Sequence, residues 1–175
     1  WEVEALTNGG AASPTLSEDR TRAYTTDQDG HLYAFDARSG TLLWRHEVGY
    51  SAGGSPMVAT DGLIVPAGGR GAAHLVAVRD RGARADTVWA HPDLANRGLV
   101  VRPDGPVVYA AVVIGAVVHL AVVRAEDGEV HTLVSTETGL VASMGTAIGP
   151  DGRVYLTTPI NGVYSFVPDG VPVVD

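Results

Sequence analysis

The 175-residue chain contains no cysteine and no lysine, and each absence narrows the chemistry that it can perform. Without cysteine there is no disulfide, no thiolate nucleophile and no cysteine-ligated metal. All 12 basic residues are arginines, and with 20 acidic residues the formal net charge is −8. This charge argues against a nucleic-acid partner, because phosphate binding needs clustered positive charge.

Long hydrophobic runs are also scarce, and the longest one favours strands over a membrane span. Residues 107–123 carry no charge, but a membrane helix needs about 20 residues to cross a ~30 Å hydrocarbon core. Valine dominates this run, and valine is enriched in strands. We expect two buried strands, 106–113 and 117–124, joined by a tight turn near Gly115, with His119 as an ordinary strand histidine.

The usual catalytic and metal-binding patterns carry little weight in this sequence. There is no His-x-His or HExxH spacing among the six histidines. The letters Gly-x-Ser-x-Gly occur at 49–53, but without the following helix that a nucleophile elbow needs, so they do not support a nucleophile. Asp27-Gln28-Asp29-Gly30 is too short for a calcium loop, which favours a plain hairpin turn. His91-Pro92-Asp93 is only a weak metal pattern. We therefore expect no catalytic residue, no metal ligand and no cofactor-binding residue.

What the chain does contain is a repeat. Its three tryptophans, Trp1, Trp44 and Trp89, are separated by 43 and 45 residues, and a fourth unit places Gly128 four residues before Thr132. Residues 34–44 have the form of a β-hairpin, in which Asp36 can bond its own backbone and Gly40 can take a positive φ. A period in the forties with short strands and glycine turns is typical of a β-propeller blade.

The hairpin resembles a known family motif. Residues 34–44 are similar to the A-x-D-x-x-T-G-x-x-x-W docking motif of the quinoprotein-like (PQQ-like) β-propeller repeat, with Ser39 in place of Thr. In the family this tryptophan packs between adjacent blades. The resemblance implies a structural docking motif made of Ala34, Asp36, Gly40, Trp44, Trp89 and Trp1. Between residues 96 and 170, Ala121, Asp127 and Gly128 remain of this motif.

The repeat predicts an all-β protein of about four four-stranded antiparallel blades, forming a single β-propeller region over 1–175. Residues 1–12 are expected as the outer strand of a preceding or closing blade, followed by blades at 13–54, 55–97 and 98–144 and a partial blade at 145–175. In the first blade we expect strands at 13–17, 21–27, 31–36 and 41–48, and in the second a stretched turn at Arg79–Asp86.

Four blades are few for this repeat, and the chain opens on Trp1, which reads as the last strand of a missing unit. We therefore expect part of a larger seven- or eight-bladed propeller in a longer natural chain. The alternative is a homodimer in which Trp1–Leu6 of one copy completes the last blade of the other.

The resemblance implies function only weakly. Relatives include quinone-dependent dehydrogenases, outer-membrane assembly lipoproteins and extracellular sensor regions of bacterial Ser/Thr kinases. The dehydrogenases have an adjacent cysteine pair beside the cofactor, which is absent here, so no cofactor is expected. We expect a non-catalytic, extracytoplasmic module (periplasmic, secreted or cell-surface) that binds a protein or small-molecule ligand as a scaffold or sensor. A fragment of a PQQ-dependent oxidoreductase and a kinase sensor region are the alternatives. Candidate loop contacts are Arg70, Tyr50, Arg97 and Asn161.

Overall fold

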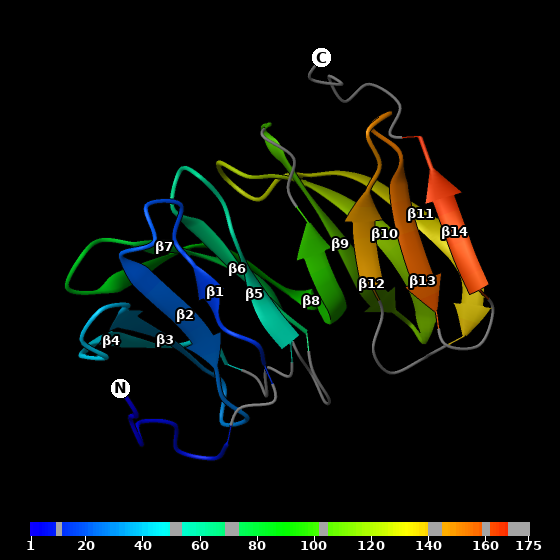
Figure 1. The fold of residues 1–175 in the computed structure, drawn as a ribbon. Helices are drawn as coiled ribbons and strands as arrows, with labels where there is room; N and C mark the ends of the chain where they lie inside the picture. The colour runs from blue at the N-terminus through cyan, green and yellow to red at the C-terminus, as the bar shows by residue number, and fades with distance from the viewer. Residues whose placement is uncertain are drawn as a thin grey trace.

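The computed structural model describes residues 1–9, 12–49, 54–68, 74–101, 105–139, 145–158 and 162–167. Every regular element in these ranges is a β-strand, and all strand pairs are antiparallel. The all-β prediction is therefore confirmed. The strands form three sheets that follow one another along the chain (Figure 1).

The first sheet has the order β1-β2-β3-β4. Its strands are β1 (Thr15–Leu16), β2 (Arg22–Thr26), β3 (His31–Asp36) and β4 (Leu42–Glu47). These ranges lie within the expected strands. The register places Ala34 opposite Trp44 and Phe35 opposite Leu42, so β4 carries a bulge next to the tryptophan.

The second sheet contains seven strands in the order β11-β10-β9-β8-β7-β6-β5. They are β5 (Gly54–Val58), β6 (Leu63–Ala67), β7 (His74–Asp80), β8 (Ala85–Val101), β9 (Val107–Ile114), β10 (Val117–Arg124) and β11 (Val130–Gly139). The apolar run is β9 and β10, as expected, and the turn between them places Gly115 and Ala116 at φ 55° and 73°. The described part of the chain contains no helix that is long and apolar enough to cross a membrane.

One strand, β8, joins two units that the sequence predicts as separate blades. Its first part pairs with β7 and its second part with β9, and Ala95 faces a residue of each neighbour. The strand continues through position 98, although its register against β9 shifts between Asn96 and Val100. The buried Asn96 side chain donates to Pro66 O at 3.0 Å and accepts from Gly98 N at 3.3 Å, which replaces part of the bonding that a turn would supply.

The third sheet has three strands in the order β12-β13-β14. They are β12 (Gly145–Ile148), β13 (Val154–Thr158) and β14 (Gly162–Phe166). Within the described ranges, β14 pairs on one side only, with β13.

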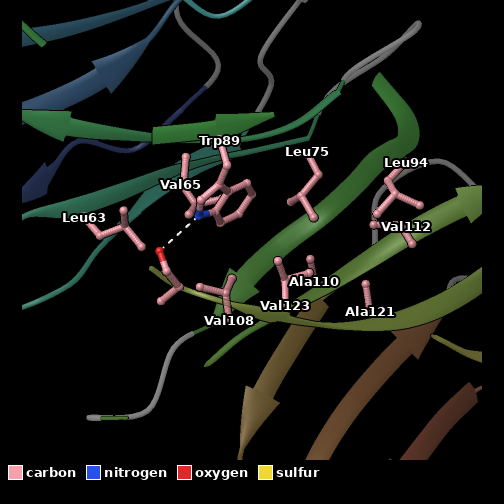
Figure 2. Close-up of a cluster of buried hydrophobic side chains, with 12 residues drawn as sticks. Leu63, Val65, Leu75, Trp89, Leu94, Val108, Ala110, Val112, Ala121 and Val123 are labelled. Carbon is pink, nitrogen blue, oxygen red and sulfur yellow. Dashed lines mark hydrogen bonds between the residues drawn. The ribbon is translucent and has the colours of Figure 1, made fainter. Parts of the chain in front are cut away.

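The core lies between successive groups of strands rather than inside one of them. One cluster joins Tyr24 and Trp44 of the first sheet to Ile64, Val76 and Val78 of β6 and β7. A second joins β6–β8 to β9 and β10 around Trp89 (Figure 2). Two smaller clusters join β9 and β10 to the third sheet, with Val154 and Leu156 fully buried. The sheets therefore stack side by side along the chain, as blades do.

Candidate functional site

The tryptophan positions form one repeated contact, seen most completely at Trp89. Its indole Nε1 donates to Ala125 O at 3.0 Å, and the side chain is 6% exposed. The ring covers Gly128, which has a φ of +82°, so closely that an added Cβ would stand 2.6 Å from it. The neighbouring His91 contributes a second link, between its Nε2 and Gly128 O at 2.6 Å. His91 thus bonds the next turn within the described part of the chain, rather than forming part of a metal cluster.

Trp1 makes the same contact one unit earlier. Its Nε1 donates to Ala37 O at 3.1 Å, and its ring covers Gly40, where an added Cβ would stand 2.5 Å away. The donor and acceptor are 36 residues apart in both cases. Asp36 supports the turn, because its Oδ1 accepts from Ser39 N at 2.7 Å and from Ser39 Oγ at 2.8 Å. The hydrogen bond from Ser39 N is the main cause of a lowered pKa at Asp36, and the bond from Ser39 Oγ lowers it further.

Trp44 differs from the other two tryptophans. It is 5% exposed and packs with Tyr24, their ring centroids 6.0 Å apart, but its Nε1 has no hydrogen-bond partner in the described structure. The cause is the length of the opposing hairpin. In this hairpin, residues 79–86 lie between the last equivalent strand pairs. In the other two hairpins the corresponding residues are 36–41 and 124–129, two fewer in each case. The stretched turn expected at Arg79–Asp86 thus forms extra strand pairs. It does not present a glycine on which the Trp44 indole can lie, as Gly40 and Gly128 do for Trp1 and Trp89.

The third unit has the same turn as residues 36–40, at 124–128, but with different residues in it. Gly128 N donates to Arg124 O as Gly40 N donates to Asp36 O, both at 2.9 Å, so Arg124 stands in the place of Asp36. Arg124 Nε donates to Asp127 Oδ1 at 2.8 Å, which lowers the pKa of Asp127 to about 2. The residue opposite Thr132 is Val122, as Ala34 is opposite Trp44. Because of this register, Val122 and not Ala121 is the equivalent of Ala34.

A polar cleft of about 370 Å³ opens at the boundary between the first sheet and β5–β8. Three turns surround it, namely β1–β2, β5–β6 and β7–β8. Its lining consists of Ser17, Glu18, Asp19, Arg22, Tyr24, Val58, Ala59, Thr60, Gly62, Asp80 and Gly82. It lies at the boundary where the indole Nε1 of Trp44 has no hydrogen-bond partner among the described residues.

A charged clasp holds the two sides of this cleft together. Arg22 Nη1 donates to both carboxylate oxygens of Asp80, at 2.9 and 2.7 Å, and to Gly82 O at 2.9 Å. Tyr24 Oη donates to Asp80 Oδ2 at 2.8 Å. Burial, with help from this bond, raises the pKa of Tyr24. The clasp was not predicted, because Arg22 and Asp80 are 58 residues apart and no motif links them.

The rim of the cleft is acidic. Asp19 accepts from Ser17 Oγ at 2.6 Å and from Thr21 N at 3.0 Å, and these bonds lower its pKa. Glu18 beside it is exposed. A carboxylate with a lowered pKa is a weak base at neutral pH, so Asp19 is poorly suited to activate the Ser17 hydroxyl. The arrangement is better suited to binding a positively charged group than to acid–base chemistry.

Asp27 is a buried carboxylate with a structural role. Its Oδ1 accepts from Asp29 N and His31 N, and its Oδ2 accepts from Tyr33 Oη at 2.6 Å and Thr7 Oγ1 at 2.9 Å. Burial by itself would raise the pKa of Asp27, but these hydrogen bonds lower it to about 2. The Asp27–Gly30 segment is therefore a hairpin turn around a buried carboxylate, in agreement with the prediction of a plain turn.

The candidate loop contacts fall outside what the structure describes of the chain. Tyr50, Arg70 and Asn161 lie outside the described residues, and Arg97 is on β8 with its side chain outside them. His119 is an ordinary strand histidine, whose Nδ1 lies 2.9 Å from Val117 O. No group of three or more His, Asp or Glu that could hold a metal occurs in the described part of the chain.

Two solved structures have the same fold. The β-propeller domain of Cps50 (Swd1) from Myceliophteria thermophila matches with a TM-score of 0.71 and 11% identity, over 94% of this chain and 55% of that one. The computationally designed Ika4 protein matches with a TM-score of 0.69 and 12% identity, over 94% of each chain. The β-propeller prediction is thereby confirmed.

Sequence comparison extends this to the family. Protein Rv3035 of Mycobacterium tuberculosis (strain ATCC 25618 / H37Rv) is 31% identical over 175 residues, which cover 96% of this chain. The chain spans 42% of the length of that relative. Residues 1–169 match the profile of the family described as outer membrane protein assembly factor BamB. The chain therefore belongs to this family of PQQ-like β-propeller proteins, as the hairpin at 34–44 predicts.

Proposed function

We propose that the chain is a non-catalytic, extracytoplasmic binding module, which holds a basic segment of a partner protein in the cleft between the first sheet and β5–β8. The observation that carries this proposal is the cleft of about 370 Å³. It has an acidic rim, and the Arg22–Asp80 pair joins its two sides. Glu18 is exposed on the rim, and Arg22 is already bonded to Asp80. The lining therefore offers negative charge that its own arginine does not neutralise.

The family supports a protein partner and an extracytoplasmic location, because its description names an outer membrane assembly factor. The roles of the carboxylates support binding over catalysis. Asp27 and Asp36 accept hydrogen bonds that close their own turns, and Asp80 joins two sheets. A fragment of a quinone-dependent oxidoreductase is the alternative.

Selection of peptides from a random displayed library tests the binding proposal. We expect selected peptides to carry Arg or Lys and to bind more weakly as salt increases, because the attraction is between exposed charges. Glu18→Arg and Thr60→Arg, both at exposed rim positions, should weaken binding about tenfold or more. Glu126→Arg places the same charge on an exposed turn outside the cleft and should leave binding unchanged.

Two results would refute the proposal. One is a set of selected peptides whose binding is equally affected by Glu126→Arg and Glu18→Arg. The other is quinone-dependent dye reduction by the purified protein with alcohols or sugars, which would favour the oxidoreductase.

A further inference from the structure

The guanidinium of Arg22, which lines the cleft, bonds to the protein through one of its nitrogens. Its Nη1 donates to both oxygens of Asp80 and to Gly82 O. In the described part of the chain its Nε and Nη2 have no hydrogen-bond partner, and the side chain is 27% exposed. The edge formed by Nε and Nη2 is therefore available to a ligand in the cleft.

This Nε–Nη2 edge is suited to a carboxylate, because its two parallel N–H groups match the two oxygens of that group. Asp80 does not take this place. Its oxygens already accept from Arg22 Nη1 at 2.9 and 2.7 Å, from Tyr24 Oη at 2.8 Å and from Gly82 N at 2.7 Å. The carboxylate that the edge fits best is therefore one that a ligand brings.

The acidic rim adjoins this edge. The backbone N of Arg22 donates to Ser17 Oγ at 3.0 Å, and Ser17 Oγ donates to Asp19 Oδ1 at 2.6 Å. Glu18, in the same turn, is exposed and also lines the cleft. The cleft thus offers a place for a negative group and a place for a positive group side by side, which favours a ligand that carries both charges.

We infer that the basic segment ends in this cleft, with an arginine or lysine as the last residue of the partner chain. The α-carboxylate of that residue binds the Nε–Nη2 edge of Arg22, and its side-chain cation lies at Glu18. Val58 and Ala59 provide partly buried apolar lining for the side-chain stem. A volume of about 370 Å³ is at the small end for ligand pockets and suits the end of a chain. This inference rests on the proposed function and specifies its ligand.

Isothermal titration calorimetry with two synthetic peptides tests the inference on the unmodified protein. Both are acetylated and consist of four glycines followed by one arginine, and they end in a free carboxylate or in an amide. The acid should bind at least about tenfold more tightly than the amide, because it alone makes charge-assisted hydrogen bonds to Arg22. Attraction to the acidic rim alone predicts the opposite order, because the amide lacks a negative charge.

A third peptide separates a terminal carboxylate from a side-chain carboxylate. It is acetylated, has three glycines followed by arginine and aspartate, and ends in an amide. It carries the same two charges on neighbouring residues and should bind at least about tenfold more weakly than the acid, because its carboxylate is on another residue.

Arg22→Lys tests the role of the guanidinium edge. Lysine keeps a cation for Asp80 but lacks the flat pair of N–H groups, so the acid should lose its preference over the amide, to about twofold or less. Arg153→Lys is the matched control and should keep the preference. Arg153 is exposed outside the cleft lining, and Gly149 N donates to its carbonyl as Ser17 N donates to that of Arg22. A purely structural role of Arg22 would weaken both peptides equally.

The inference is overturned if the acid does not bind, if the amide binds as tightly as the acid, or if the aspartate peptide equals the acid. It is also overturned if Arg22→Lys keeps the preference for the acid. The proposed function fails by a different result, namely library-selected basic peptides that Glu18→Arg does not weaken. Selected peptides that depend on Glu18 but bind equally as acids and amides would leave the binding function standing and refute the C-terminal ligand.

Discussion

The indole of Trp89 lies on Gly128 so closely that any side chain at this glycine would meet the ring 2.6 Å away. Gly128→Ala should therefore lower the free energy of unfolding by about 3 kcal/mol or more, through both a left-handed backbone and displacement of a buried aromatic. Gly82→Ala is the control, because Gly82 has a φ of +94° with nothing within 4 Å. It should cost only about 1–2 kcal/mol. Urea unfolding measures the free energy of unfolding of both variants. Equal losses for Gly128→Ala and Gly82→Ala would contradict the conclusion that Gly128 makes room for the Trp89 indole.

The unpartnered indole of Trp44 makes a second prediction. Trp44→Ala should cost about 3–5 kcal/mol, since the side chain is 5% exposed and packs against β6 and β7. Trp44→Phe should cost less than Trp89→Phe by about 1 kcal/mol, because only Trp89 loses a hydrogen bond, to Ala125 O. Denaturant midpoints measure the loss of stability in each variant. A larger loss for Trp44→Phe than for Trp89→Phe would show that the Trp44 N–H has a hydrogen-bond partner.

The Arg22–Asp80 clasp should couple the first sheet to β7. Arg22→Met leaves the Asp80 carboxylate, 9% exposed, without its cation and should cost about 2–4 kcal/mol. Arg22→Met combined with Asp80→Asn should cost clearly less than the sum of the single changes. Arg153→Met is the control, because Arg153 pairs with Asp151 within one exposed turn. Additive effects in the double variant would mean that the pair contributes nothing.

Asp27 should make stability depend on pH. Its pKa is lowered to about 2 in the folded protein, so folding favours the ionised form and the stabilisation is complete above the ordinary value of 3.8. It is lost as the pH falls from about 4 to 2, on the order of 2 kcal/mol.

Asp27→Asn should remove this part of the pH dependence. Asp93→Asn, at an exposed position of β8, should retain it. Unfolding free energies at pH 5, 4 and 3 provide the comparison, and parallel curves for wild type and Asp27→Asn would contradict the assignment.

Local patterns predicted much of the fold. The strands β3 and β10 have the expected bounds, and the turn at Gly115 lies where the valine run is interrupted. These features depend on residues close together in the sequence. The continuity of β8 through position 98 does not, because it depends on the buried amide of Asn96 bonding to Pro66 on another strand.

The candidate site was harder to predict for the same reason. The cleft forms where turns from β1–β2, β5–β6 and β7–β8 converge, and its clasp links residues 58 apart. The tryptophan spacing predicted similar contacts at every unit, but the longer hairpin at 79–86 leaves Trp44 without the hydrogen bond of Trp1 and Trp89. The interval of 45 residues between Trp44 and Trp89, against 43 between Trp1 and Trp44, contains the two added residues, but the interval alone does not say which turn holds them.

The passage of β8 from β7 to β9 has a consequence for how the molecule opens. Backbone amides from β5 to β11 belong to one sheet, whereas in the described residues the first and third sheets pack against it through clusters of side chains. Hydrogen exchange should therefore report β5–β11 as a single cooperative unit, with the slowest exchange near Ala95, and the flanking sheets should exchange earlier and independently of each other.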